Sequence, residues 1–164
     1  MVKVDENMAR SQTVPSYDEL HIEIVGKLKK TGETLKKIGY EYRDVSPKEL
    51  YDYLTGETPT GDITTIVYVL ASEYLMIHEV VETSELKKAG IPLNTQTVMK
   101  YHPDVYRVHF TATDIELDYA VSKKDYDWVK ARINLAPSWL EDDMMPKHLV
   151  PRCRALMEKF SRIP

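Results

Sequence analysis

The chain has 164 residues, of which 43% are hydrophobic and 29% charged, a balance typical of a globular protein rather than a disordered one. Its net charge is −4 at pH 7, whereas general nucleic-acid binding needs a basic surface. Nucleic acid is therefore not an expected partner. The length fits one domain, and we expect a flexible N-terminal arm over residues 1–15 and a single helical domain over residues 16–164.

Cysteine content and apolar patterning predict a cytoplasmic protein. Cys153 is the only cysteine and has no partner for an intramolecular disulfide, and the N-terminus shows no apolar signal core. The most apolar run, residues 63–81, has the length of a membrane span, but Glu73, His78 and Glu79 within it argue against insertion. We therefore expect no membrane association.

The first predicted helix begins at Ser16, which opens a Ser-x-x-Glu capping box. Apolar residues follow at spacings of three and four, as in an amphipathic helix. Gly26 and Gly32 weaken this helix, which predicts a break near Thr31 and a final stop at Gly39.

A second capping box at Ser46, with Pro47 at the first helical position, predicts a short helix. The Gly- and Pro-rich stretch 55–61 is typical of a loop. Asp62 is the expected N-cap of the longest helix, which should run over residues 63–88 and end before Gly90.

Residues 105–121 allow two interpretations. The segment "IELDYAV" alternates apolar and polar residues, as a strand of a β-hairpin would. Helical spacing instead gathers Arg107, Thr111, Asp114 and Asp118 into one narrow polar wedge, and for this reason we favour a helix that begins at Pro103.

The remaining sequence predicts a helix over residues 123–133, capped by Ser122, and a last helix that begins at Pro151. The chain thus predicts about six helices joined by short connections. This pattern is typical of an all-α fold, a compact helical bundle.

Polar residues interrupt the apolar stripe of the helix over residues 63–88. On a helical wheel that starts at residue 63, His78 and Glu85 fall at about 60° and 40°, within or beside the stripe. Glu82 and Glu73 lie on its two flanks at about 100° and 280°, whereas Glu79 falls on the opposite side, where we expect solvent. His78 and Glu82 are four residues apart, so their side chains can touch.

The helix expected at 103–121 shows the same feature. Relative to Val105, His109 and Glu116 fall near about 40° and 20°, in the middle of the apolar face. A buried carboxylate is costly unless it meets a proton, a cation or a metal. We therefore expect side chains of the two helices to meet in a polar pocket, with His78, Glu82, Glu85, His109, Glu116 and Glu73 as its candidate residues.

A mixed set of nitrogen and oxygen donors suits a divalent transition metal such as zinc, iron or manganese. The chain lacks the Glu-x-x-His spacing of ferritin-like proteins, and "HEVVE" carries a glutamate where zinc peptidases have their second histidine. Three hypotheses stay open at this point: a metal site, a metal-free pocket that binds a small molecule or performs acid–base chemistry, and a purely structural hydrogen-bond network.

A different class of function would use the tyrosines of "GYEYRDVSPKELYDY". Tyr40, Tyr42, Tyr51 and Tyr53 are of the type that protein interfaces favour, and they serve equally well to seal the rim of a bundle. The alternative hypothesis is therefore a non-enzymatic module that associates with itself or with a protein partner through these tyrosines.

Overall fold

The computed structural model describes residues 13–59 and 65–164, and within these ranges the secondary structure is helical. The helices follow one another in the order α1 (Tyr17–Lys37), α2 (Pro47–Thr55), α3 (Ile66–Ala71), α4 (Glu73–Lys88), α5 (Thr97–Ser122), α6 (Tyr126–Ile133), α7 (Ala136–Leu140), a 3-10 turn (Lys147–Leu149) and α8 (Val150–Ser161). The predicted all-α class is confirmed.

The two predicted capping boxes are present. The hydroxyl of Ser16 accepts a hydrogen bond from the backbone N–H of Glu19, and the Glu19 carboxylate accepts one from the Ser16 N–H in return. Ser46 and Glu49 repeat this exchange at the start of α2. These local bonds satisfy N–H groups that the first helical turn leaves without a partner.

The first predicted break is wrong, because α1 runs without interruption through Thr31 to Lys37. Both Thr31 and Gly32 are buried, and the side chain of Tyr42 packs directly on the Gly32 backbone. Tertiary packing thus compensates for the low helix propensity of glycine. The expected stop is confirmed, since Gly39 has a φ of 82° and follows the last turn.

The prediction of a single helix over residues 63–88 is also wrong. The described part of this stretch forms α3 and α4, separated at Ser72, whose backbone is extended with φ −116° and ψ 122°. The Ser72 hydroxyl accepts a hydrogen bond from the Leu75 N–H and so caps α4. The expected cap Asp62 lies outside the described residues.

Residues 105–121 form a helix and not a hairpin. They belong to α5, which starts earlier than predicted, at Thr97, and has non-helical backbone angles at Tyr101, two residues before Pro103. Proline removes an N–H donor and crowds the preceding turn, which accounts for the kink. The next helix, α6, is capped by Asp125 and not by Ser122, which lies in the last turn of α5.

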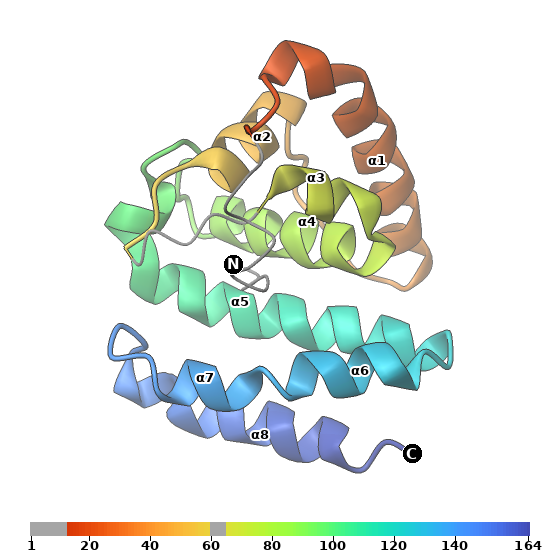
Figure 1. Cartoon of the computed structure of the whole chain (residues 1–164), viewed down its shortest axis with the longest axis vertical. Coiled ribbons are helices and arrows are strands. Elements are labelled where there is room, and N and C mark those ends of the chain that lie inside the picture. Colours follow the sequence, from red (N-terminus) through yellow and green to blue (C-terminus); the bar gives the residue numbers. More distant parts are fainter. Residues whose placement is uncertain (1–12, 60–64) are drawn as a thin grey trace.

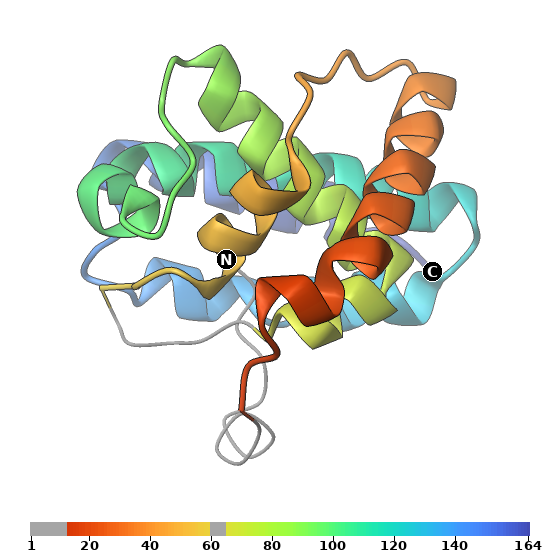
Figure 2. The same cartoon turned by 90° about the horizontal axis from the view of Figure 1, so that it is seen from above.

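The long helix α5 crosses the middle of the molecule, with α1–α4 on one side and α6–α8 on the other (Figure 1). The view from above places α1, α2 and α4 over α5 (Figure 2). One apolar cluster lies between α1–α4 and α5 and includes Val105, Val108 and Ala112 of α5. A second cluster joins Phe110 and Leu117, also of α5, to α6–α8. Both faces of α5 are therefore buried.

In the part of the chain that the structure describes, no helix combines the length and the apolar character that a bilayer crossing requires.

Two glycines of α1 provide a test of its packing. Gly26 is exposed and a Cβ there would meet no atom within 4 Å, so we expect Gly26→Ala to raise the free energy of unfolding by about 0.5–1 kcal/mol. A Cβ at Gly32 would overlap the hydroxyl of Tyr42, so Gly32→Ala should be less favourable than Gly26→Ala. Urea denaturation measures both, and an equal gain from the two substitutions would contradict the packing described for Gly32.

Candidate metal centre

Helix α4 has no solvent-facing side over most of its length, because α1, α2, α3 and α5 all pack against it. His78, Glu79 and Glu82 are consequently completely buried. On the facing helix α5, Glu116 is completely buried and His109 is 4% exposed. The contact between α4 and α5 thus holds a cluster of ionisable side chains inside the protein.

Three side-chain atoms of this cluster converge on one point. His78 Nε2 lies 3.1 Å from Glu82 Oε2 and 3.1 Å from His109 Nδ1, and His109 Nδ1 lies 3.3 Å from Glu82 Oε2. A tetrahedral zinc ion with ligands at about 2.0–2.1 Å holds those ligands about 3.3 Å apart. The three atoms therefore already have the spacing of ligands on a single small cation.

Protons on the two histidine rings do not turn all three contacts of this triangle into hydrogen bonds at once. A carboxylate oxygen only accepts, so every proton between the three atoms must come from His78 Nε2 or His109 Nδ1. If His78 Nε2 and His109 Nδ1 both carry a proton, their two N–H groups face each other across 3.1 Å. If only one of them carries a proton, the other nitrogen and the Glu82 oxygen face each other with lone pairs. A cation between the three atoms accepts one lone pair from each of them.

The remaining nitrogen of His78 has a well-defined partner. His78 Nδ1 donates to Glu116 Oε2 at 2.8 Å, and this bond directs the Nε2 lone pair of the neutral ring toward Glu82 and His109. Carboxylates commonly orient metal-binding histidines in this manner. Glu116, which the sequence presented as a potential ligand, is thus placed to orient His78 from outside the triangle.

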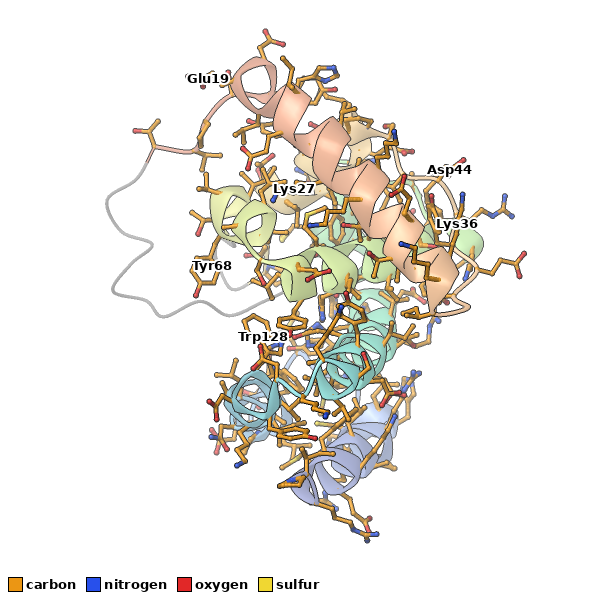
Figure 3. All side chains as sticks on the ribbon, turned by 90° about the vertical axis from the view of Figure 1, so that its right-hand side faces the viewer. Glu19, Lys27, Lys36, Asp44, Tyr68 and Trp128 are labelled. Atoms are coloured by element: carbon orange, nitrogen blue, oxygen red, sulfur yellow. The ribbon has the colours of Figure 1, made fainter. Side chains whose placement is uncertain are left out.

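Two residues of α6 hold the Glu116 carboxylate. Arg132 donates to Glu116 Oε1 from Nε at 2.7 Å and to Oε2 from a terminal nitrogen at 3.0 Å. Trp128 Nε1 donates to Oε1 at 2.7 Å. Figure 3 shows Trp128 of α6 between the helices α3 and α4 on one side and α5 and α6 on the other. Such fork-shaped pairing restricts both the position and the rotation of the carboxylate.

The electrostatics of the cluster follow from burial and pairing. Burial opposes ionisation of Glu116, yet the Arg132 guanidinium and the His78 hydrogen bond lower its pKa to about 2. Burial lowers the pKa of His109 to about 3, so this ring stays neutral. Burial also disfavours a charge on His78, but its bonds to Glu116 and Glu82 outweigh burial and raise the pKa. A metal would displace the His78 proton, since metal binding requires the neutral ring.

The charge of the buried cluster depends on its protonation. Among the described residues, the carboxylates of Glu82 and Glu116 face the guanidinium of Arg132 and the imidazole of His78, whose pKa is raised, while the raised pKa of Glu79 favours its uncharged form. Unpaired buried charge is strongly unfavourable. A divalent ion at the triangle would supply the positive charge in place of the proton on His78.

Glu79 corrects the sequence-based expectation of a solvent-facing side chain. It is completely buried, and neither carboxylate oxygen has a hydrogen-bond partner among the described residues. The helical wheel assumed a single buried face, whereas α4 is covered all round. Burial raises the pKa of Glu79, and the negative charge of Glu82 acts in the same direction.

Two candidates of the predicted pocket lie elsewhere. Glu85 is half-buried and accepts hydrogen bonds from Tyr40 at 2.5 Å and from Lys88 at 2.8 Å. Glu73 is exposed and accepts a hydrogen bond from Tyr119 at 2.7 Å. The structure therefore brings together His78, Glu82, His109 and Glu116 but leaves out Glu85 and Glu73.

The four candidate interface tyrosines have intramolecular contacts. Tyr40 donates to Glu85, Tyr42 packs on Gly32, and Tyr51 donates to the Pro15 carbonyl oxygen at 2.9 Å. These three are half-buried, and their role in an interface stays a prediction. Tyr53 instead lies in the interior, 5% exposed.

Tyr53 is part of the cluster, because its hydroxyl donates a short hydrogen bond to Glu82 Oε1. This leaves Glu82 Oε2 directed at the two histidines. Glu79, Arg132 and Trp128 were not predicted as site residues, and Tyr53 was predicted only as an interface residue. Local spacing contains no signal for Arg132 and Trp128, and it places Glu79 on the opposite side of the helical wheel from the apolar stripe.

Comparisons of the chain with protein-family models, with curated proteins and with solved structures found no match.

Proposed function

We propose that this protein binds one divalent transition-metal ion through His78 Nε2, Glu82 Oε2 and His109 Nδ1. The observation that carries the proposal is the mutual spacing of these atoms, 3.1 to 3.3 Å, in a completely or almost completely buried position. Two imidazole nitrogens and one carboxylate oxygen with tetrahedral spacing favour zinc over ions that prefer six oxygen ligands.

The surrounding residues support the same assignment. Glu116 orients His78, Arg132 and Trp128 hold Glu116, and Tyr53 orients Glu82. A metal site requires supports of this kind to keep its ligands in place.

Metal content tests the proposal. Protein purified without chelator and then dialysed against metal-free buffer is expected to retain about one zinc ion per chain by plasma mass spectrometry. His109→Ala and Glu82→Ala should each lose it, because two remaining ligands do not hold zinc tightly.

Glu85→Ala is the matched control for Glu82→Ala, since both residues lie on α4 but Glu85 pairs with Tyr40 and Lys88 outside the cluster. It should retain the metal. Wild-type protein that takes up no zinc, or equal retention by Glu82→Ala and Glu85→Ala, would contradict the assignment and leave the structural network as the explanation.

A further inference from the structure

A cavity of about 190 Å³ lies where α1 passes the junction of α3 and α4. Lys27, Lys30 and Thr31 of α1 line one side of it, and residues 70–77, from the end of α3 and the start of α4, line the other. Figure 3 shows Lys27 between the ribbons of α1 and α3. None of the three proposed metal ligands lines this cavity, so a ligand bound here would not depend on the metal.

Thr31 presents an unused hydroxyl to the cavity. The residue is 6% exposed and lies in the buried stripe of α1, and within the described part of the chain its hydroxyl has no hydrogen-bond partner. Thr34, in contrast, donates to the Lys30 carbonyl oxygen at 3.2 Å, as threonines in helices commonly do. Buried hydroxyl groups are usually hydrogen-bonded, because their removal from water is costly. The expected partner of Thr31 therefore lies in the cavity, as water in the free protein and as a polar group of the ligand in a complex.

The two lysines of the cavity are also available to a ligand. Neither Lys27 nor Lys30 forms an ion pair with a carboxylate of the described residues. Glu73 lines the same cavity, but its Oε1 accepts a hydrogen bond from the Tyr119 hydroxyl of α5 at 2.7 Å. Two ammonium groups and one carboxylate give the lining a net charge of +1, and the N-terminus of α4 adds partial positive charge.

We propose that this cavity binds a small organic molecule that carries a single carboxylate. The ligand carboxylate accepts a hydrogen bond from the Thr31 hydroxyl and pairs with the ammonium groups of Lys27 and Lys30. Its apolar part packs on Leu70 and Ile77 on the opposite side of the cavity. The arrangement is that of most small-molecule sites, in which a few polar groups fix the orientation of the ligand against an apolar wall.

Size and charge restrict the class of ligand. An apolar cavity of about 150 Å³ accommodates benzene, so a molecule of about six to ten non-hydrogen atoms fits the volume observed here. A single negative charge matches the net charge of the lining. A phosphate monoester, which carries nearly two negative charges at pH 7, would exceed that charge and would face the Glu73 carboxylate.

Benzoate is a suitable probe, because it combines a single carboxylate with an apolar body of this size. Titration of the ¹⁵N-labelled full chain, followed by NMR, should shift the backbone amide signals of residues 27–34 and 70–77 with a Kd of about 1 mM or lower. Benzamide has nearly the same shape without the charge and should bind at least about 10-fold more weakly. Shifts confined to other residues, or equal affinities for the two compounds, would overturn the proposal.

Thr31→Val tests the hydroxyl, because valine keeps the shape of the side chain and cannot donate a hydrogen bond. Benzoate should bind at least about 10-fold more weakly, as expected for the loss of one hydrogen bond to a charged group. The Tm should not fall, since no described group uses this hydroxyl. An unchanged affinity for benzoate in this variant is incompatible with the proposed site.

The double variant Lys27→Met and Lys30→Met tests the charges and should weaken benzoate binding about 10-fold. Lys37→Met is its matched control, because Lys37 lies on the same helix but does not line the cavity, and it should keep the wild-type affinity. The same affinity in the double variant and in the control would mean that the two lysines do not bind the carboxylate. Tighter binding of phenyl phosphate than of benzoate would overturn the assignment to singly charged carboxylates.

Discussion

Replacement of Arg132 by methionine is expected to lower the free energy of unfolding by about 3–5 kcal/mol, since it leaves the Glu116 carboxylate buried without its countercharge. Methionine retains most of the buried aliphatic stem, so the loss reports mainly on the charge. Urea denaturation in the presence of a chelator measures the effect without a contribution from metal binding.

The matched control is Arg162→Met. Arg162 pairs with Glu158 at 2.6 Å, but the two side chains are 76% and 69% exposed. Exposed ion pairs contribute about 0–1 kcal/mol. A loss at Arg132 no larger than the loss at Arg162 would show that Glu116 does not depend on its buried partner.

A second substitution sharpens this test. Adding Glu116→Gln to Arg132→Met should recover part of the lost stability, because an uncharged amide needs no countercharge in the interior. Glu116→Gln alone should be destabilising, since it leaves the Arg132 guanidinium buried without its carboxylate. Additive losses in the double variant would indicate that the two side chains do not act as a pair.

Metal loading is expected to produce the other large effect, an increase in thermal stability. A ligand that binds the folded state alone, at a free concentration about 1,000 times its Kd, adds about 4 kcal/mol to the free energy of unfolding. For a chain of this length that corresponds to an increase in Tm of about 8–16 °C. Calorimetry of the zinc-loaded protein and of the chelator-treated protein measures the difference.

Two variants show whether this increase arises at the proposed ligands. His109→Ala removes one ligand and should abolish most of the difference between the loaded and the chelated protein. His21→Ala removes an exposed imidazole whose Nδ1 lies 2.7 Å from the Tyr17 hydroxyl, far from the cluster in the fold, and should leave the difference unchanged. A zinc-dependent increase that survives in His109→Ala would place the metal elsewhere.

Much of the fold could be predicted from sequence because its determinants are local. Capping at Ser16 and Ser46 depends on residues three positions apart, and the stop at Gly39 depends on the backbone freedom of glycine. The break at Ser72 was missed because the apolar pattern continues across it. Serine is a common helix cap, but only the packing of α3 and α4 shows that the chain bends there.

The candidate site could likewise be predicted only in part from the sequence. Helical spacing alone placed His78 and Glu82 on one helix and His109 and Glu116 on another, each within or beside an apolar face. Which of these atoms meet depends on how α4 and α5 cross and on their relative axial position, and no local pattern specifies either quantity. Glu85 was therefore included in error by its position on the wheel, and it pairs with Tyr40 instead.

The sequence by itself determined an all-helical chain and the helices that carry buried histidine and glutamate. The tertiary structure alone decided that α4 is covered on every side, which buries Glu79, and that α6 brings Arg132 to Glu116. Sequence periodicity reports the average polarity of a helix face, whereas the environment of one side chain depends on neighbours from distant parts of the chain.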